Sequence, residues 1–329
     1  MAVALRIFVT VLIATFFLPG SWNLASAWVF NPDLRKAANF SQVGVIEFSL
    51  PEGRSTGTAF LVGECIVMTN FHVAFGPWYL TQVRPPSNTN KGTFTLTQVT
   101  LPNGRHPSTG AIPFMWGDYL GPERQFKRPA NDWVLLAVED CLGSRYGFLL
   151  PYEATLDDDM PDSGGFTAFG YSTGRQMVDS NCSIRLGGGS GSAATMLNDC
   201  AALHGDSGAP IIRRGTNRVV AMISGFHAGS SMSCTSFNGV VYEPWSPQCT
   251  NNAIPFSAPL IEQIERANWD TYAQNLLLRL GYDAGQYGVI DQLLLAKAIK
   301  DVQTDMGMRP TGKMNTPLGE ILRIRNLGI

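Results

Sequence analysis

The sequence predicts an all-β protein followed by a small three-helix domain. Between about residues 43 and 262, short runs rich in Val, Ile, Phe and Thr are separated by clusters of Gly, Pro, Asn and Ser, which is typical of a sandwich or barrel. After Pro255 the apolar residues recur at helical spacing. The chain has 329 residues, of which 45% are hydrophobic and 15% charged, and this favours about two folded domains.

Several segments in the first part have the composition of strands. Examples are Val43–Leu50, Gly57–Val62, Cys65–Thr69, Trp133–Val138, Gly165–Gly170 and Val219–Phe226. Long connections with turn residues lie between them, so we expect functional groups to lie on loops.

The C-terminal part predicts three helices and a linker. Residues Ala258–Ala267 can form a helical linker, and Thr271–Leu280 reads as a helix that Gly281 stops. Asp291 can cap a second helix that continues to Met306. We expect Leu294, Ile299 and Val302 to face inward on that helix. A third helix is expected over Leu318–Ile324, with Pro317 in its first turn.

The N-terminus has the pattern of a secretory signal peptide, residues 1–27. Arg6 precedes an apolar run over residues 7–18, and Ala25-Ser26-Ala27 forms a small-residue cleavage site. The run is too short to cross about 30 Å of hydrocarbon as a helix. No later segment is long and apolar enough, so we expect no membrane span after signal cleavage and a periplasmic or secreted protein.

All six cysteines lie after the signal: Cys65, Cys141, Cys182, Cys200, Cys234 and Cys249. Their spacing matches no metal site, and in an exported protein an even number of cysteines indicates disulfides. We therefore expect neither a metal nor a cofactor. The net charge of −2 gives no reason to expect a nucleic acid as partner.

Three segments carry reactive residue types in order: residues 57–73 contain His72, residues 131–140 contain Asp132, and residues 200–210 contain Ser207. A serine hydroxyl needs a base to take its proton, and an imidazole base needs a carboxylate to fix its tautomer. The three residues can therefore form a nucleophile–base–carboxylate triad.

These segments, as TNFHV, DWVLL and GDSGAP, resemble the trypsin-like serine proteases of the chymotrypsin fold. The resemblance covers about residues 43–264 and implies two six-stranded antiparallel β-barrels in a protease domain over 28–264. It implies that Ser207 is the nucleophile, His72 the base and Asp132 the group that orients it. The backbone N–H groups of Gly205 and Ser207 would form the oxyanion hole.

The segment around SGFHAGSS, with FNGVV after it, resembles the bacterial glutamyl endopeptidases. This resemblance implies a specificity pocket with His227 and Ser230. Ala201 and Ala202 complete the pocket, although they stand where that family often carries a Thr or Ser. The resemblance favours an acidic or small residue before the cleaved bond over Arg or Lys. The alternative is that His227 is a structural histidine of the barrel.

The trypsin-like resemblance also implies a disulfide between Cys182 and Cys200. Cys234 and Cys249 flank one loop and are expected to pair, which leaves Cys65 with Cys141. No trypsin-like neo-N-terminus precedes the first strand, so Asp206 needs another partner. Arg185 is the candidate, as in bacterial relatives that need no propeptide.

Residues 265–329 resemble a peptidoglycan-binding domain. Leu280-Gly281-Tyr282, Ala298-Ile299 and Thr311-Gly312 fit that family, whereas Val302 replaces its usual Phe. The resemblance implies docking to the cell wall. A different protein partner, or a structural cap, is the alternative.

We therefore predict a secreted serine endopeptidase that acts on protein or peptide substrates through an acyl-enzyme and docks to the wall by its C-terminal domain. Two alternatives remain. One is a catalytically silent, protease-like binding protein, and the other is a hydrolase of peptidoglycan stem peptides.

Overall fold

A computed structural model gives the fold of most of the chain. The residues that it describes are 40–50, 53–76, 90–118, 129–153, 165–172, 175–185, 196–198, 200, 202, 204–225, 251–315, 318–319 and 321–322.

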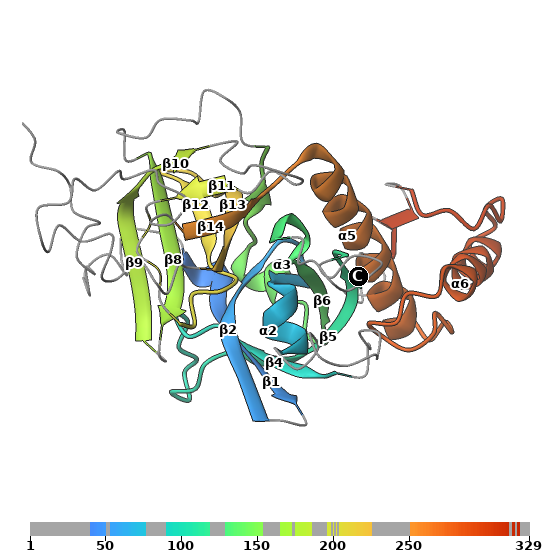
Figure 1. Ribbon diagram of the computed structural model, residues 1–329. Coiled ribbons are helices and arrows are strands. Elements are labelled where there is room, and N and C mark those ends of the chain that lie inside the picture. Colours follow the sequence, from blue (N-terminus) through green and yellow to red (C-terminus); the bar gives the residue numbers. More distant parts are fainter. Residues whose placement is uncertain are drawn as a thin grey trace, which may run out of the picture.

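The first half of the chain forms a closed antiparallel barrel (Figure 1). Around the barrel the strand order is β1-β2-β3-β6-β5-β4. The strands are β1 Val43–Leu50, β2 Gly53–Leu61, β3 Ile66–Thr69, β4 Gly92–Thr95, β5 Ser108–Trp116 and β6 Val134–Val138. This confirms the first of the two predicted barrels.

Short helices lie at the ends of these strands. They are η1 Phe40–Gln42, α2 Phe71–Phe75, η3 Pro129–Asn131 and α3 Leu142–Tyr146. The barrel interior is a closely packed apolar cluster that includes Phe48, Leu61 and Phe94, all with at most 1% of their surface exposed. Burial of such side chains stabilises the barrel by about 2 kcal/mol each.

The second half forms an eight-stranded sheet that does not close along its described strands. The row runs β10-β11-β14-β13-β12-β8-β9, and β7 joins it by a parallel pairing with β13. The strands are β7 Leu150–Pro151, β8 Phe166–Ser172, β9 Arg175–Cys182, β10 Ile184–Arg185, β11 Met196–Asn198, β12 Pro210–Arg213, β13 Arg218–Gly225 and β14 Asn251–Pro255. The expectation of a second six-stranded, all-antiparallel barrel therefore needs correction, because β9 and β10 end the row unpaired with each other and β7 adds a parallel pair.

An apolar cluster joins the two halves. It contains residues of the first barrel, such as Phe60, and residues of the second sheet, such as Phe169 and Tyr171. Phe40 stacks on Phe169 with their ring centroids 4.3 Å apart, and Phe60 meets Phe256 edge-on. The same cluster fixes the two halves against each other, and the reactive residues lie where they meet.

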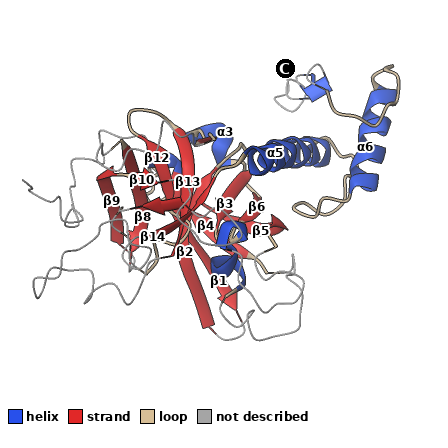
Figure 2. Cartoon of the chain, turned by 45° about the horizontal axis from the view of Figure 1, so that its top comes forward, coloured by secondary structure: helices blue, strands red, loops and turns tan. Residues whose placement is uncertain are grey.

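Helix α5, Ala258–Arg279, is one continuous helix of 22 residues. In this region the sequence predicted a linker helix over Ala258–Ala267 and a separate helix over Thr271–Leu280. The polar residues between them do not break α5, because the Thr271 hydroxyl donates to the carbonyl of Ala267 one turn earlier and Asn268 donates to the Val62 carbonyl of the barrel. Helix α5 follows β14 of the second sheet, and Figure 2 shows it between the strands and α6.

Helix α6, Gln292–Asp305, begins at the predicted cap. The Asp291 carboxylate accepts hydrogen bonds from the backbone N–H groups of Leu293 and Leu294. Ile299 and Val302 are buried as expected, whereas Leu294 is 37% exposed and the expectation that it faces inward is wrong. The next residue, Leu295, is buried in the small core in its place.

The helical part has its own apolar core, and α5 belongs to two cores. Its first half contributes Leu260, Ile264 and Ala267 to the cluster between the barrel and the sheet. Its second half contributes Leu276 and Leu277 to the core of the helical part. Of the third predicted helix, only residues 318–319 and 321–322 are described, and all four are helical.

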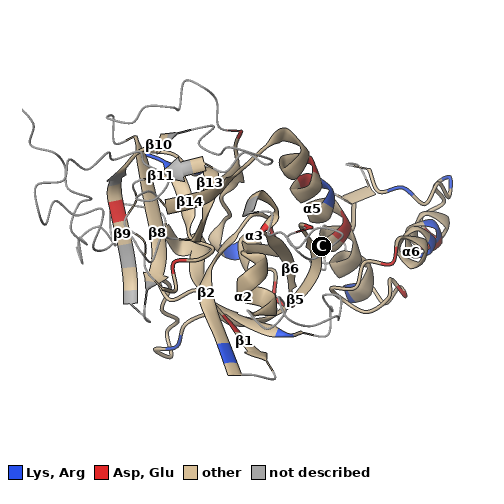
Figure 3. Ribbon diagram, in the orientation of Figure 1, with Lys and Arg blue, Asp and Glu red and all other residues tan. Residues whose placement is uncertain are grey.

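Charged side chains of both signs lie along α5 and α6, while most strands carry few of them (Figure 3). Within the described ranges, no helix combines the length and the hydrophobicity that a bilayer crossing requires.

Candidate active site

His72 and Asp132 form the centre of the site. His72 lies in α2, directly after β3, and Asp132 lies at the start of the segment that leads into β6. Because β3 and β6 are neighbours in the barrel, residues at these ends come together. The Nδ1 atom of His72 lies 2.7 Å from Oδ2 of Asp132.

The Asp132 carboxylate is buried, with 1% of its surface exposed, and accepts three hydrogen bonds. The backbone N–H of His72 donates to Oδ1 at 3.0 Å. The His72 ring and the hydroxyl of Ser224 both donate to Oδ2 at 2.7 Å. Three donors compensate for the loss of water around a buried carboxylate. The ring of His72 is therefore held from one side by a fixed acceptor.

This contact determines the tautomer of a neutral His72 ring. Since an ionised carboxylate only accepts, Nδ1 must carry the proton, and Nε2 is then the unprotonated nitrogen that can act as a base. The His72 side chain is 33% exposed, so the ring is accessible from outside.

Asn70 and Ser224 support the pair and were not predicted. The buried Asn70 precedes α2, and its side-chain amide donates to the Asp132 carbonyl at 2.9 Å. Ser224 comes from the end of β13 in the other half of the molecule. The available signals were weak: Asn70 adjoins the TNFHV segment, and Ser224 is a serine before Gly225 at the end of an apolar strand.

Ser207 lies on a tight loop before β12, bracketed by two glycines. Gly205 and Gly208 have φ angles of 102° and 89°, a region that side chains other than glycine rarely adopt. The N–H groups of Gly208 and Ala209 donate to carbonyls, those of Ile223 and Asp206. Within the described part of the chain, no carbonyl accepts the N–H of Gly205 or of Ser207. The predicted oxyanion hole formed by these two N–H groups stays a prediction.

Asp206, between these residues, is buried at 2% exposure. Its carboxylate packs so closely on β8 that a Cβ atom at Gly170 would lie 2.4 Å from Oδ1. The side chain of Arg185, the predicted partner of Asp206, lies outside the described residues, and this pairing stays a prediction.

Most of the predicted specificity pocket is likewise outside the described residues: Ala201, His227 and Ser230. Ala202 is partly buried against the apolar cluster inside the second sheet. No group of three or more metal-binding side chains occurs in the part of the chain that the structure describes.

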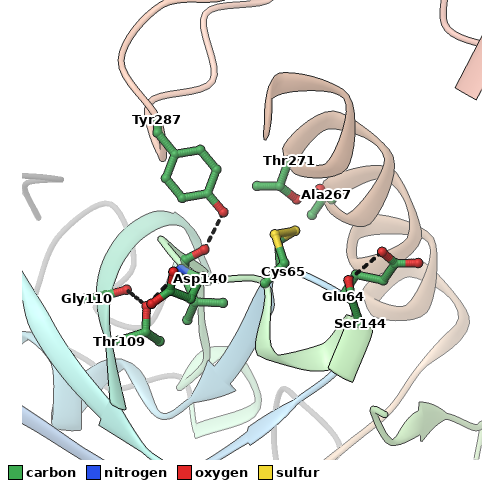
Figure 4. The surroundings of a disulfide bond; sticks show 11 residues. Glu64, Cys65, Thr109, Gly110, Asp140, Ser144, Ala267, Thr271 and Tyr287 are labelled. Atoms are coloured by element: carbon green, nitrogen blue, oxygen red, sulfur yellow. Dashed lines mark hydrogen bonds between the residues drawn. A yellow bond between two sulfur atoms is a disulfide. The ribbon is translucent and has the colours of Figure 1, made fainter. Parts of the chain in front are cut away.

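Each half of the molecule contains a disulfide. Cys182 is bonded to Cys200, seven residues before Ser207, and Cys65 is bonded to Cys141. Both match predicted pairs, while Cys234 and Cys249 lie outside the described residues. Figure 4 shows the Cys65–Cys141 disulfide beside α5, which packs on β3.

The sequence matches no family model and no curated protein. Among solved structures, a Glu endopeptidase shares 16% identity over 74% of this chain and 95% of its own, with a TM-score of 0.46. The thermostable serine protease AL20 from an extremophilic microorganism shares 12% identity over 70% of this chain and 98% of its own, with a TM-score of 0.45. An inactive form of Rv3671c from M. tuberculosis H37Rv shares 17% identity over 71% of this chain and 95% of its own, with a TM-score of 0.43. Values this low transfer no activity to the present chain.

Proposed function

We propose that this chain is a serine endopeptidase in which His72, Asp132 and Ser207 form the catalytic triad. The observation that carries the proposal is the 2.7 Å contact between Nδ1 of His72 and the buried Asp132 carboxylate. It holds an exposed imidazole in the tautomer that a general base needs. The tight glycine-bracketed loop of Ser207 supplies a nucleophile with two backbone donors beside it.

In the first step, the Ser207 Oγ attacks the carbonyl carbon of the substrate peptide while its proton passes to Nε2 of His72. Asp132 stabilises the imidazolium that forms, and the N–H groups of Gly205 and Ser207 stabilise the oxyanion. The C–N bond then breaks, and the amine leaves with the proton from His72.

In the second step, a water molecule attacks the acyl-enzyme ester and gives a proton to Nε2. The bond between the acyl carbon and Ser207 Oγ breaks, the proton returns to the serine, and the acid product leaves. Neither of these two reaction steps uses a metal or a redox partner.

A fluorophosphonate probe tests the proposal. Purified mature protein should be labelled covalently, and Ser207→Ala should abolish labelling. Asp132→Asn should lower kcat on a peptide substrate by about 10⁴-fold, because the imidazole then adopts the wrong tautomer. Folded protein that resists labelling would instead support the silent binding protein.

We further propose export to the periplasm or the medium after removal of residues 1–27, since disulfides persist in oxidising compartments. N-terminal sequencing of the secreted protein tests the cleavage site. A start well after Trp28 would contradict both this site and the absence of a propeptide. Cleavage after acidic or small residues remains the proposed preference, and peptide-library profiling of the mature enzyme tests it.

We also propose that residues 265–329 bind peptidoglycan. The exposed side chains of Trp269 and Leu293, 48% and 83% accessible, offer apolar contacts to a glycan or stem peptide. Binding to purified sacculi should be measured with the full-length Ser207→Ala protein, because α5 is shared with the protease part. Binding that Trp269→Ala does not reduce would place the contact elsewhere, and no binding would contradict the proposal.

A further inference from the structure

We infer that Thr58 is a positioning residue that holds the Ser207 loop in its working geometry and fixes the position of this loop relative to His72. The inference rests on the proposed function. Thr58 lies in β2, has no exposed surface, and cannot touch a substrate.

All the polar groups of Thr58 are used, and three of its four bonds reach the second half of the molecule. Its N–H donates to the Ser207 carbonyl at 2.9 Å, and its hydroxyl donates to the Gly205 carbonyl at 2.9 Å. The same hydroxyl accepts from the N–H of Tyr171 in β8, also at 2.9 Å. The carbonyl of Thr58 accepts from the hydroxyl of Thr69 at 2.7 Å.

The two carbonyls that Thr58 binds flank the proposed oxyanion hole. The hydrogen bond to the Gly205 carbonyl fixes the peptide plane between Gly205 and Asp206. The hydrogen bond to the Ser207 carbonyl fixes the plane between Ser207 and Gly208. The N–H of Ser207 lies between these planes, so both of its neighbours are held by one residue. Because Gly205 lacks a Cβ, its own backbone imposes little restraint, and the restraint comes from Thr58.

The loop also sits directly on the backbone of β2. A Cβ atom at Gly208 would lie 2.0 Å from the Thr58 carbonyl oxygen, and one at Gly57 would lie 3.0 Å from the Ser207 carbonyl oxygen. The hydrogen bonds therefore act over a contact that leaves no room for water. Loss of one of them cannot be repaired by a solvent molecule.

Thr58 is linked to the other half of the site through Thr69. Thr69 ends β3 and is followed by Asn70, whose amide binds the Asp132 carbonyl, and then by α2 with His72. The base and carboxylate come from the first half and the nucleophile from the second. Thr58 thus connects both parts by direct hydrogen bonds.

Removal of the hydroxyl should therefore affect the transition state more than substrate binding. Thr58→Val keeps the shape but leaves the Gly205 carbonyl and the Tyr171 N–H without their partner. We expect kcat to fall by about 10- to 100-fold, in line with the effect of a small misplacement of catalytic groups. KM should stay within about twofold, since the residue does not touch substrate. Thr58→Ser, which restores the hydroxyl, should recover most of kcat.

The matched control is Thr109→Val. Thr109 is also a buried barrel threonine, and its hydroxyl bonds only to backbone groups, those of Gly110 and Asp140 (Figure 4). It lies on the side of the barrel that carries the Cys65–Cys141 disulfide. Its replacement should lower the melting temperature comparably and leave kcat unchanged.

The experiment measures kcat, KM and inhibition by a peptide aldehyde, whose hemiacetal oxygen uses the oxyanion hole, beside inhibition by the product peptide. Thr58→Val should weaken aldehyde inhibition in proportion to kcat and leave product inhibition unchanged. A full kcat in Thr58→Val, or an equal loss in Thr109→Val, would overturn the inference. If Thr58→Val fails to fold, Thr58→Cys replaces it, because its thiol is a weaker donor and acceptor, and an intermediate loss of kcat is expected.

These outcomes are separate from failure of the proposed function. Fluorophosphonate labelling of the unchanged protein decides whether Ser207 is a nucleophile. The role of Thr58 is then decided in the labelled enzyme, where a kcat that does not depend on the Thr58 hydroxyl, or that falls equally in Thr109→Val, contradicts it.

Discussion

Single side chains in this molecule are held by partners that lie far away in the sequence. Asp132 shows this best, since its carboxylate binds His72, 60 positions earlier, and Ser224, 92 positions later. A donor from the second half therefore orients the carboxylate that holds the His72 ring in the first half.

We predict that Ser224→Ala lowers kcat/KM by about tenfold, which corresponds to about 1.4 kcal/mol of lost transition-state stabilisation. The reason is that one of three donors to a buried carboxylate disappears while the geometry of His72 is otherwise kept. Steady-state kinetics on a peptide substrate measure the effect.

The control for this change is Ser144→Ala. The Ser144 hydroxyl also donates to a carboxylate, that of Glu64 at 2.7 Å, but far from the triad on the exposed surface. It should leave kcat/KM unchanged, and an unchanged value in Ser224→Ala would show that Asp132 needs only its two bonds from His72.

At this scale the sequence predicted the reactive types but not their supports. His72 and Asp132 stand in recognisable segments, and they do meet. Ser224, Asn70 and Thr58 are common residues in common contexts, and their roles depend on which strands lie opposite them. Nothing local distinguishes a serine at a strand end that faces a carboxylate from one that faces water.

Secondary structure elements were predictable where their apolar runs were uninterrupted. The six expected strands occur as β1, β2, β3, β6, β8 and β13, with ends shifted by a few residues. The strands that no named segment matched include β4, which is four residues long, and β5, which contains both Gly110 and Pro113. Neighbouring strands override such weak propensities, because pairing and burial supply the stabilisation that the residues lack.

Tyr287 adds a hydrogen bond between the helical part and the barrel. Its hydroxyl donates to the Val138 carbonyl at the end of β6 (Figure 4). Burial raises the pKa of the Tyr287 hydroxyl above its ordinary value. The folded state therefore favours the neutral phenol, and its stabilisation is complete below about pH 10 and lost as the pH rises further.

We predict that Tyr287→Phe lowers the free energy of unfolding by about 1 kcal/mol at pH 7 through the lost hydrogen bond. Above about pH 10 the unchanged protein should lose stability faster than the variant, so the gap between them narrows. Urea unfolding at a series of pH values measures both curves. Parallel curves up to pH 11 would show that Tyr287 ionises freely in the folded protein.

The two disulfides should differ in their contributions. Cys65 and Cys141 are separated by 76 positions and Cys182 and Cys200 by 18. On loop entropy, replacement of the first pair by alanines should cost roughly 4 kcal/mol and of the second roughly 3 kcal/mol. Only the second pair adjoins the Ser207 loop, so only its loss should also reduce fluorophosphonate labelling. Thermal unfolding and labelling of the two double variants test this; an equal loss of labelling in both would contradict it.

At the scale of the whole molecule, the order of apolar and polar residues along the chain does not predict how the second sheet and α5 pack on the first barrel. Alternation of apolar residues predicted strands in the second half, but it could not predict that β7 joins in parallel or that β9 and β10 stay unpaired with each other. Sheet closure depends on the tilt and offset of every strand, and these follow from packing against the first barrel. The continuity of α5 has the same origin, since contacts with the barrel keep its polar middle helical.

Because α5 lies in two cores, we predict one cooperative unfolding transition in calorimetry. Ile264→Ala and Leu277→Ala remove side chains from different cores, and each should shift the whole transition at a cost of about 2–5 kcal/mol. The exposed Glu265→Ala on the same helix is the control and should shift nothing. Two resolved peaks, each moved by only one variant, would contradict this prediction.

A single unbroken helix also acts as a rigid arm. Its 22 residues extend about 33 Å, with the candidate catalytic head attached along one half and the proposed wall-binding end along the other. An enzyme tethered by a flexible linker searches a volume around its anchor, whereas a stiff arm presents the part that it carries at one height and in one orientation. If the far end binds the wall and the proposed activity holds, the reach of the candidate active site is set by the length of a helix, and substrates must come to that layer.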